Sequence, residues 1–250
     1  MFKINSFGLS DVGIIREKNE DVWGRIVGKN FFVLADGMGG HRAGEVAARE
    51  TVNALCKKIK KYIDSEHQPS TENFAEALKK AIKEVNQKIF QLGSQSEELR
   101  GMGTTLCSLY FNQNQVIFSH VGDSRIYRIR GEEILQLTKD HSLFAELIDS
   151  GKVEKDQSGN FFYKNIITKA IGTDVNVEPE VHIDTIEHDD FYLVCSDGLT
   201  DLLSDEEIGM IIITSASLRN AAERLIAKAK MEGGHDNITV IVLHAEERND

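Results

Sequence analysis

Apolar residues recur along the first half of the chain with two different periods. Short apolar or alternating runs predict three β-strands, at residues 4–9, 21–26 and 31–35. Residues 44–62 and 72–92 instead carry apolar side chains three and four positions apart, which predicts two amphipathic helices. The first half therefore predicts a small group of strands followed by a helical pair.

The second half returns to short apolar runs separated by turn-forming residues. These runs predict strands at residues 104–111, 116–121, 125–130, 134–137, 181–183, 191–195 and 238–243. Asp140 is expected to cap a short helix that ends near residue 150, and the polar segment 151–163 is expected to form a flap. Longer helices are expected at 205–213 and 218–231.

The order of these elements predicts the fold class. Successive hairpins imply mainly antiparallel sheets, and four long helices must cover them. We therefore expect an α+β fold, a four-layer α-β-β-α sandwich with two mainly antiparallel β-sheets flanked by helices, plus a small flap. The chain has 250 residues and no long linker, so a single domain over residues 1–250 is expected.

Charge and cysteine usage narrow the class of protein. The net charge is −11, and the basic run at 57–61 follows a helical pattern, so nucleic acid is not an expected partner. The 3 cysteines are isolated from one another, which favours buried thiols in a reducing compartment. The first residues lack the apolar core of a signal peptide, and apolar stretches are too short to cross a bilayer. A cytoplasmic protein without membrane contact is expected.

Acidic residues mark the ends or beginnings of several predicted strands. Six occupy such positions: Glu20, Asp21, Asp36, Asp123, Asp197 and Asp236. Each one alone is explained as a turn residue, because Asp-Gly is common turn chemistry. As a set, carboxylates at neighbouring strand ends would repel one another unless a cation neutralised them. Oxygen ligands without cysteine favour Mg²⁺ or Mn²⁺ over zinc.

Two further residues suit phosphate chemistry. Arg16, four residues before Glu20, offers a bidentate grip on phosphate oxygens, although a plain surface arginine is the simpler explanation. His41 follows a glycine-rich turn between a strand and a helix, where it could act as a general acid or simply start the helix. A nucleotide-binding loop is disfavoured, because residues 37–42 fail G-x-G-x-x-G at the last position and no Walker lysine is present.

Seven segments in order resemble the PPM family, the type-2C metal-dependent protein serine/threonine phosphatases, in its compact bacterial form. The resemblance covers nearly the whole chain and is carried by residues 16–21, 35–41, 101–105, 121–125, 137–142, 195–199 and 234–239. It implies hydrolysis of phosphoserine and phosphothreonine in proteins. It also implies a flap subdomain at about 142–169, a bacterial serine/threonine kinase as the opposing partner, and a monomer.

The resemblance also implies a role for each site residue. Asp36 would bridge two Mn²⁺ or Mg²⁺ ions, with Asp197 and Asp236 completing the first ion's ligands and Glu20 and the Gly37 carbonyl serving the second. The remaining roles are as follows: Asp21 would orient the attacking water, Asp123 would help to hold a weaker third ion, Arg16 would bind the phosphate, and His41 would protonate the leaving oxygen. Direct attack by a metal-bridging water is the expected mechanism.

Two other functions compete with this interpretation. A pseudophosphatase would use the same fold for binding alone, but it usually lacks metal ligands, and here every expected position is filled. A different metal-dependent hydrolase, such as a phosphodiesterase, could use similar acids. The order of the seven segments argues against it.

Overall fold

The computed structural model describes residues 2–39, 43–66, 69–95, 97–153 and 166–247. Its strands form two sheets in which neighbouring strands run antiparallel. One sheet has the order β2-β3-β5-β6-β9, with β4 paired to β3: β2 Asp21–Ile26, β3 Phe31–Met38, β4 Gly103–Thr104, β5 Leu106–Asn112, β6 Gln115–Val121 and β9 Glu180–Thr185. The other has the order β1-β11-β10-β7-β8: β1 Phe2–Asp11, β11 Ile238–Glu247, β10 Asp190–Cys195, β7 Arg125–Arg130 and β8 Glu133–Gln136.

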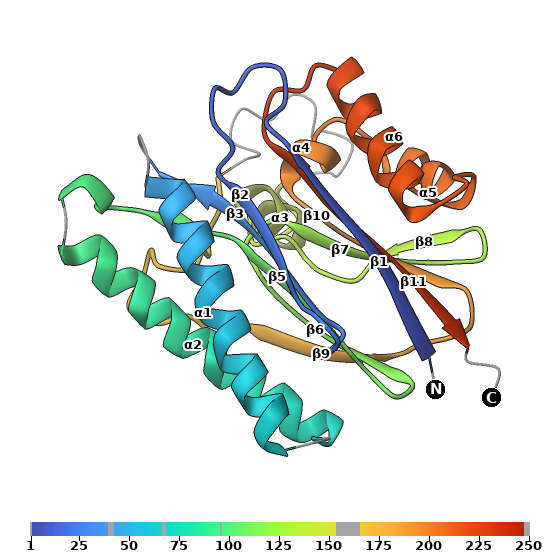
Figure 1. Ribbon diagram of the computed structural model, residues 1–250. Coiled ribbons are helices and arrows are strands. Elements are labelled where there is room, and N and C mark those ends of the chain that lie inside the picture. Colours follow the sequence, from blue (N-terminus) through green and yellow to red (C-terminus); the bar gives the residue numbers. More distant parts are fainter. Residues whose placement is uncertain (1, 40–42, 67–68, 96, 154–165, 248–250) are drawn as a thin grey trace.

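Helices cover the outer face of each sheet (Figure 1). The first sheet carries α1 (Ala43–Glu66) and α2 (Thr71–Gln95), and the second carries α5 (Asp205–Ile213) and α6 (Leu218–Met231). Three shorter helices join the framework: η1 Glu97–Leu99, α3 Leu143–Asp149 and α4 Asp197–Thr200. The predicted four-layer α-β-β-α sandwich is confirmed.

The continuous apolar runs are explained by three separate hydrophobic layers. In β3, Phe31 and Val33 face the α1–α2 layer, whereas Phe32 and Leu34 face the opposite sheet. Strand β10 divides its residues in the same way between the α5–α6 layer and the space between the sheets. Successive side chains of a strand point to opposite faces, so a strand buried on both faces must be apolar at every position.

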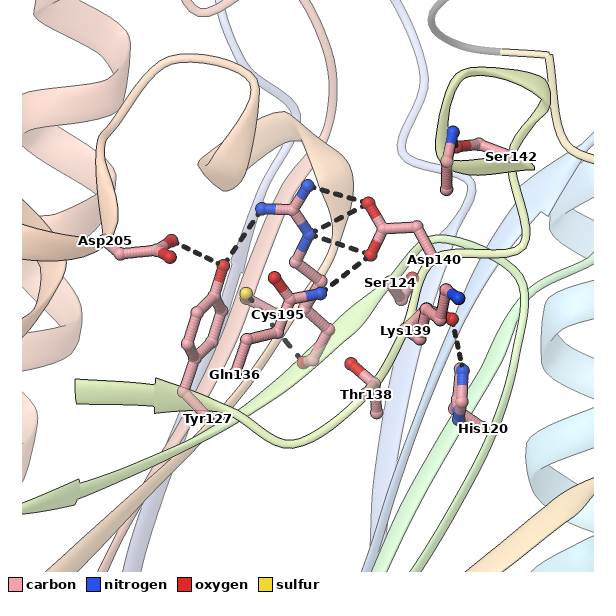
Figure 2. Close-up of polar contacts among 12 residues, drawn as sticks. His120, Ser124, Tyr127, Gln136, Thr138, Lys139, Asp140, Ser142, Cys195 and Asp205 are labelled. Carbon is pink, nitrogen blue, oxygen red and sulfur yellow. Dashed lines mark hydrogen bonds and ion pairs between the residues drawn. The ribbon is translucent and has the colours of Figure 1, made fainter. Parts of the chain in front are cut away.

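The predicted helix cap at Asp140 is wrong. Helix α3 is capped by Ser142, whose hydroxyl accepts a hydrogen bond from the Ala145 N–H. The Asp140 carboxylate instead accepts hydrogen bonds from Nε and Nη2 of Arg125, and Gln136 adds another at 2.9 Å (Figure 2). A guanidinium engages both carboxylate oxygens at once, which a backbone cap cannot do.

Three further expectations concern the flap segment, the cysteines and membrane-spanning helices. Residues 154–165 lie outside the described residues, and they include most of the polar segment 151–163 that was expected to form a flap. Cys107 and Cys195 are buried thiols as expected, and Cys56 is partly buried. None of the helices that the structure describes combines the length and apolar character needed to cross a membrane.

Candidate functional site

The paired ends of β2 and β3 bring the first acids together. Asp21 lies opposite Asp36 in the antiparallel register, and the Gly37 N–H donates to the Glu20 carbonyl at 3.2 Å. A Cβ at Gly37 would lie 2.2 Å from the backbone oxygen of Gly44, so only glycine allows α1 to pack this closely on β3. The missing side chain of Gly44 in turn leaves room for Oε2 of Glu20, which lies 2.9 Å from where that Cβ would stand.

The second sheet contributes its acids at the same place. Asp197 begins α4, with one residue between it and the end of β10, and Asp236 lies shortly before the start of β11. The Ser196 hydroxyl donates to Oδ2 of Asp21 at 2.8 Å, so the two sheets are joined at these strand ends. A Cβ at Gly198 would lie 2.0 Å from the Asn237 carbonyl, so this glycine permits the close contact between α4 and the start of β11.

Asn237 holds the loop that carries Arg16 and Glu20. Its side-chain oxygen accepts from the Glu20 N–H at 2.8 Å, and its NH₂ group donates to the carbonyls of Val12 and Lys18 at 3.0 and 2.8 Å. The side chain is buried, so these three bonds have little competition from water. Sequence reasoning missed this role, although Asn237 stands inside one of the seven segments.

Arg16 lies on the exposed side of the site. Its Nη2 is 2.7 Å from Oδ2 of Asp236, and its side chain is 53% exposed. The hydrogen bond with Asp236, together with the nearby charges of Glu20 and Asp197, raises the pKa of the Arg16 guanidinium above its ordinary value. The sequence-predicted arginine and acids are therefore neighbours in space. His41 lies outside the described residues.

Asp123 occupies a turn that is held from several sides. Its neighbour Gly122 has φ +106° and exchanges two hydrogen bonds with His141, one from the His141 N–H at 3.0 Å and one to the ring Nδ1 at 3.1 Å. On its other side, the Ser124 hydroxyl lies 2.7 Å from the Thr105 hydroxyl, which also accepts from the Asp36 N–H. These contacts connect the Asp123 turn to the backbone of Asp36.

The acids influence one another strongly. Burial, followed by the charge of Asp21, raises the pKa of Asp36 well above its ordinary value, and burial with the charge of Asp123 does the same to the pKa of Asp197. Burial raises the pKa of Asp21 to about 6 and that of Asp123 to about 7. Burial also raises the pKa of Glu20. Each group therefore resists ionisation unless a compensating positive charge is present.

The donor chemistry fits a hard divalent cation. Oδ1 of Asp21 and Oδ1 of Asp123 are buried and accept no hydrogen bond, so each has a free oxygen at the site. Within the described ranges, however, no group of three or more His, Cys, Asp or Glu side chains is arranged closely enough to hold a metal ion. The acids are neighbours, but they are not a preassembled ligand set.

Proteins of known name are similar in sequence to this chain. The profile of the family described as protein phosphatase 2C matches residues 16–233. Protein phosphatase PhpP of Streptococcus pneumoniae is 42% identical over 244 residues, covering 96% of this chain and 97% of that protein. Serine/threonine phosphatase stp of Listeria monocytogenes is 37% identical over 240 residues, covering 95% and 94% respectively.

Solved structures show the same fold. The Mycobacterium tuberculosis serine/threonine phosphatase PstP/Ppp has a TM-score of 0.88 at 34% identity, with 99% of this chain and 100% of that chain covered. The catalytic domain of PstP in complex with 2 manganese ions has a TM-score of 0.86 at 33% identity, with the same coverage. The matched profile and these relatives span nearly the whole chain, and the chain belongs to the protein phosphatase 2C family.

Proposed function

We propose that this chain hydrolyses phosphoserine and phosphothreonine in proteins. The observation that carries the proposal is the meeting of acids from both sheets, Asp21 and Asp36 from one and Asp197 and Asp236 from the other, with Arg16 beside them. The names of the similar proteins support the substrate class, since PhpP is called a protein phosphatase and stp a serine/threonine phosphatase.

The metal is proposed to be Mn²⁺ or Mg²⁺, with two ions in the core and a weaker third. The residues proposed to hold these ions are Glu20, Asp36, the Gly37 carbonyl, Asp123, Asp197 and Asp236. The cations would lower the pKa of bound water and neutralise charge on the phosphoryl group. The raised pKa values of Asp36 and Asp197 support this assignment, because burial and neighbouring carboxylates oppose their charged forms and a bound cation would offset both effects.

Asp21 is proposed to orient the attacking water. Its Oδ2 is fixed by the Ser196 hydroxyl, and its Oδ1 is free. The free Oδ1 can accept a hydrogen bond from a water molecule, which suits a group that positions water for attack.

Arg16 is proposed to grip the substrate phosphate. Its guanidinium engages Asp236 through one nitrogen, and half of the side chain faces solvent. A phosphate dianion offers more acceptor oxygens than this single carboxylate contact, so Arg16 can turn toward substrate while staying in the site. His41 is proposed to protonate the leaving oxygen. This role rests on the family resemblance.

We propose a single catalytic domain over residues 1–250, with a flap at about 142–169 and a monomeric state. A cognate serine/threonine kinase is the proposed partner, and its phosphorylated form is a candidate substrate.

Hydrolysis assays separate this function from its competitors. Purified protein is expected to release phosphate from p-nitrophenyl phosphate and from a phosphothreonine peptide in the presence of Mn²⁺, and excess EDTA is expected to stop both reactions. Bis(p-nitrophenyl) phosphate serves as the phosphodiester control. Preference for the diester would indicate a phosphodiesterase, and the absence of any turnover would indicate a binding protein; either result would overturn the proposal.

A further inference from the structure

Two adjacent isoleucines are exposed beside the proposed phosphate-binding arginine. Ile14 is 58% exposed and Ile15 is 65% exposed, and Arg16 follows them directly. Among the large apolar side chains that are exposed in the described ranges, these are the only two that adjoin in sequence. Single exposed apolar residues need no explanation, but a pair at the edge of a reaction site is a candidate contact surface.

The loop that carries this pair is held firmly at both ends. The N–H groups of Ile14 and Ile15 both point to the Gly234 carbonyl, at 2.8 and 3.4 Å. Before the pair, Asp11 accepts from the Gly13 N–H at 2.9 Å and pairs with Lys230. After it, the side chain of Asn237 holds the Lys18 carbonyl, as described above. The isoleucines are therefore presented on a well-anchored backbone.

Packing keeps the pair next to the metal-binding end of β11. A Cβ at Gly13 would lie 2.2 Å from the backbone oxygen of Asp236, and one at Gly234 would lie 3.0 Å from Cγ1 of Ile14. The loop thus lies directly against the Gly234–Asp236 segment. Ile14 covers Gly234 with part of its side chain and leaves the rest open to solvent.

The spacing suits an extended peptide. Consecutive Cα atoms are about 3.8 Å apart, and an extended chain advances about 3.3–3.6 Å per residue. A residue one or two positions from a phosphoresidue held by Arg16 would lie about 3.3–7 Å along the peptide, which is the scale on which Ile15 and Ile14 adjoin Arg16 along the loop. An apolar side chain at that position would remove its own surface and that of the isoleucines from water.

We propose that Ile14 and Ile15 form an apolar subsite that selects phosphoproteins with an apolar residue within two positions of the phosphoserine or phosphothreonine. The inference rests on the proposed function, because a neighbouring residue of the peptide can meet the isoleucines only when Arg16 holds the phosphate. The adjoining acidic cluster consists of charged side chains and offers no apolar contact.

The test uses matched phosphothreonine peptides of equal charge. In each pair, one of the two positions before or the two positions after the phosphothreonine (−2, −1, +1 or +2) carries leucine in one peptide and serine in the other. The measurement is the ratio of kcat/KM for leucine over serine, within each protein variant. The variants are the wild type, the double variant Ile14→Ser/Ile15→Ser, and Val27→Ser. Val27 is 81% exposed, at the opposite end of the β2–β3 hairpin from Asp21 and Asp36.

The wild type and Val27→Ser are expected to prefer leucine about tenfold at one or more positions. This is the ratio expected if part of the leucine side chain is buried against the isoleucines. The double variant is expected to show a ratio near one. A ratio near one for the wild type at every position, or an unchanged preference in the double variant, would overturn the subsite. If no variant hydrolyses any phosphothreonine peptide, the proposed function itself fails, and this outcome differs from hydrolysis without preference.

Discussion

The side-chain oxygen of Asn237 accepts a hydrogen bond of 2.8 Å from the backbone N–H of Glu20, although 217 positions of sequence separate the two residues. The same side chain also holds the carbonyls of Val12 and Lys18. One buried amide group therefore fixes the loop that carries both the proposed phosphate ligand, Arg16, and a proposed metal ligand, Glu20.

Replacing this amide is expected to lower both stability and catalysis. Asn237→Ala leaves one N–H and two carbonyl groups without their partner, so the free energy of unfolding should fall by about 1–3 kcal/mol. KM for p-nitrophenyl phosphate should rise because Arg16 loses its fixed position. Urea unfolding and steady-state kinetics measure the two effects. Asn73→Ala, on the exposed face of α2, is the matched control, and equal effects of the two substitutions would contradict the expected role.

Neutral isosteres at the buried acids are expected to separate activity from folding. Asp36→Asn or Asp197→Asn replaces a carboxyl whose ionisation is opposed by burial and by its acidic neighbours, so the metal-free protein should stay folded and unfold at an equal or higher temperature. Turnover should fall at least roughly a hundredfold, since even groups behind metal ligands are worth 10–100-fold. The control is Asp64→Asn, which removes a surface partner of Lys29. Near-normal turnover in the site variants would exclude the ligand roles.

Asp123 offers a narrower test of the proposed third ion. Asp123→Ala should weaken one Mn²⁺ binding event in calorimetry and reduce turnover, while the two tighter events remain. The Asp123 turn is held through Gly122 and Ser124, neither of which depends on the Asp123 carboxylate, so the variant should fold normally. Loss of all binding events would show that Asp123 belongs to the core pair.

The metal-free protein is expected to become less stable as pH rises. Asp21 and Asp123 have pKa values of about 6 and 7 in the folded protein, above the ordinary value of 3.8. At pH values between the ordinary pKa and the raised pKa, the folded state therefore binds more protons than the unfolded state. Stability in EDTA should therefore fall from about pH 4 to at least about pH 7, by on the order of a few kcal/mol. Urea titrations across this range test the slope, and Mn²⁺ should remove it. Asp123→Asn should reduce the fall in stability at the upper end of this pH range. A free energy of unfolding that rises with pH in EDTA would contradict the raised pKa values.

Two helical glycines should respond oppositely to alanine. At Gly198 a Cβ would meet the Asn237 carbonyl at 2.0 Å, so Gly198→Ala must separate α4 from β11 and displace Asp197. At Gly209 the nearest atom lies at 3.4 Å, an ordinary contact, and alanine should stabilise α5 by about 0.5–1 kcal/mol. Thermal unfolding compares the two variants, and a stable, active Gly198→Ala protein would contradict the close packing.

The sequence predicted the elements whose patterns are locally strong. The runs ending at Asp36 and Asp197 could be identified as central strands because both faces of each strand are buried. Helix α4 was not predicted, since its four residues are too short for a helical period to show. The cap at Asp140 was predicted wrongly because the competing partner, Arg125, lies in strand β7, 15 positions earlier in the chain.

The arrangement within the site was only partly accessible from sequence. The strand-end positions of the acids indicated that they could gather, and the structure places them as neighbours. The Asn237 contact with Glu20 and the His141 contact with Gly122 join segments that are far apart in sequence or lie in different loops. No local pattern encodes such contacts, because they depend on how the two sheets pack. The roles of the metal ligands, and of His41, stay predictions.

Strands β1 and β11 pair along ten positions, from Asp11 opposite Ile238 beside the site to Phe2 opposite Glu247 at the other end (Figure 1). At about 3.4 Å per residue, the far ends of this ribbon lie roughly 30 Å from the reaction centre. A fluorescent label or an affinity handle joined at either end would therefore point away from an incoming phosphoprotein. Because the two ends are adjacent, a donor and an acceptor dye placed there would report separation of the ribbon during unfolding, while turnover is followed independently at the opposite end.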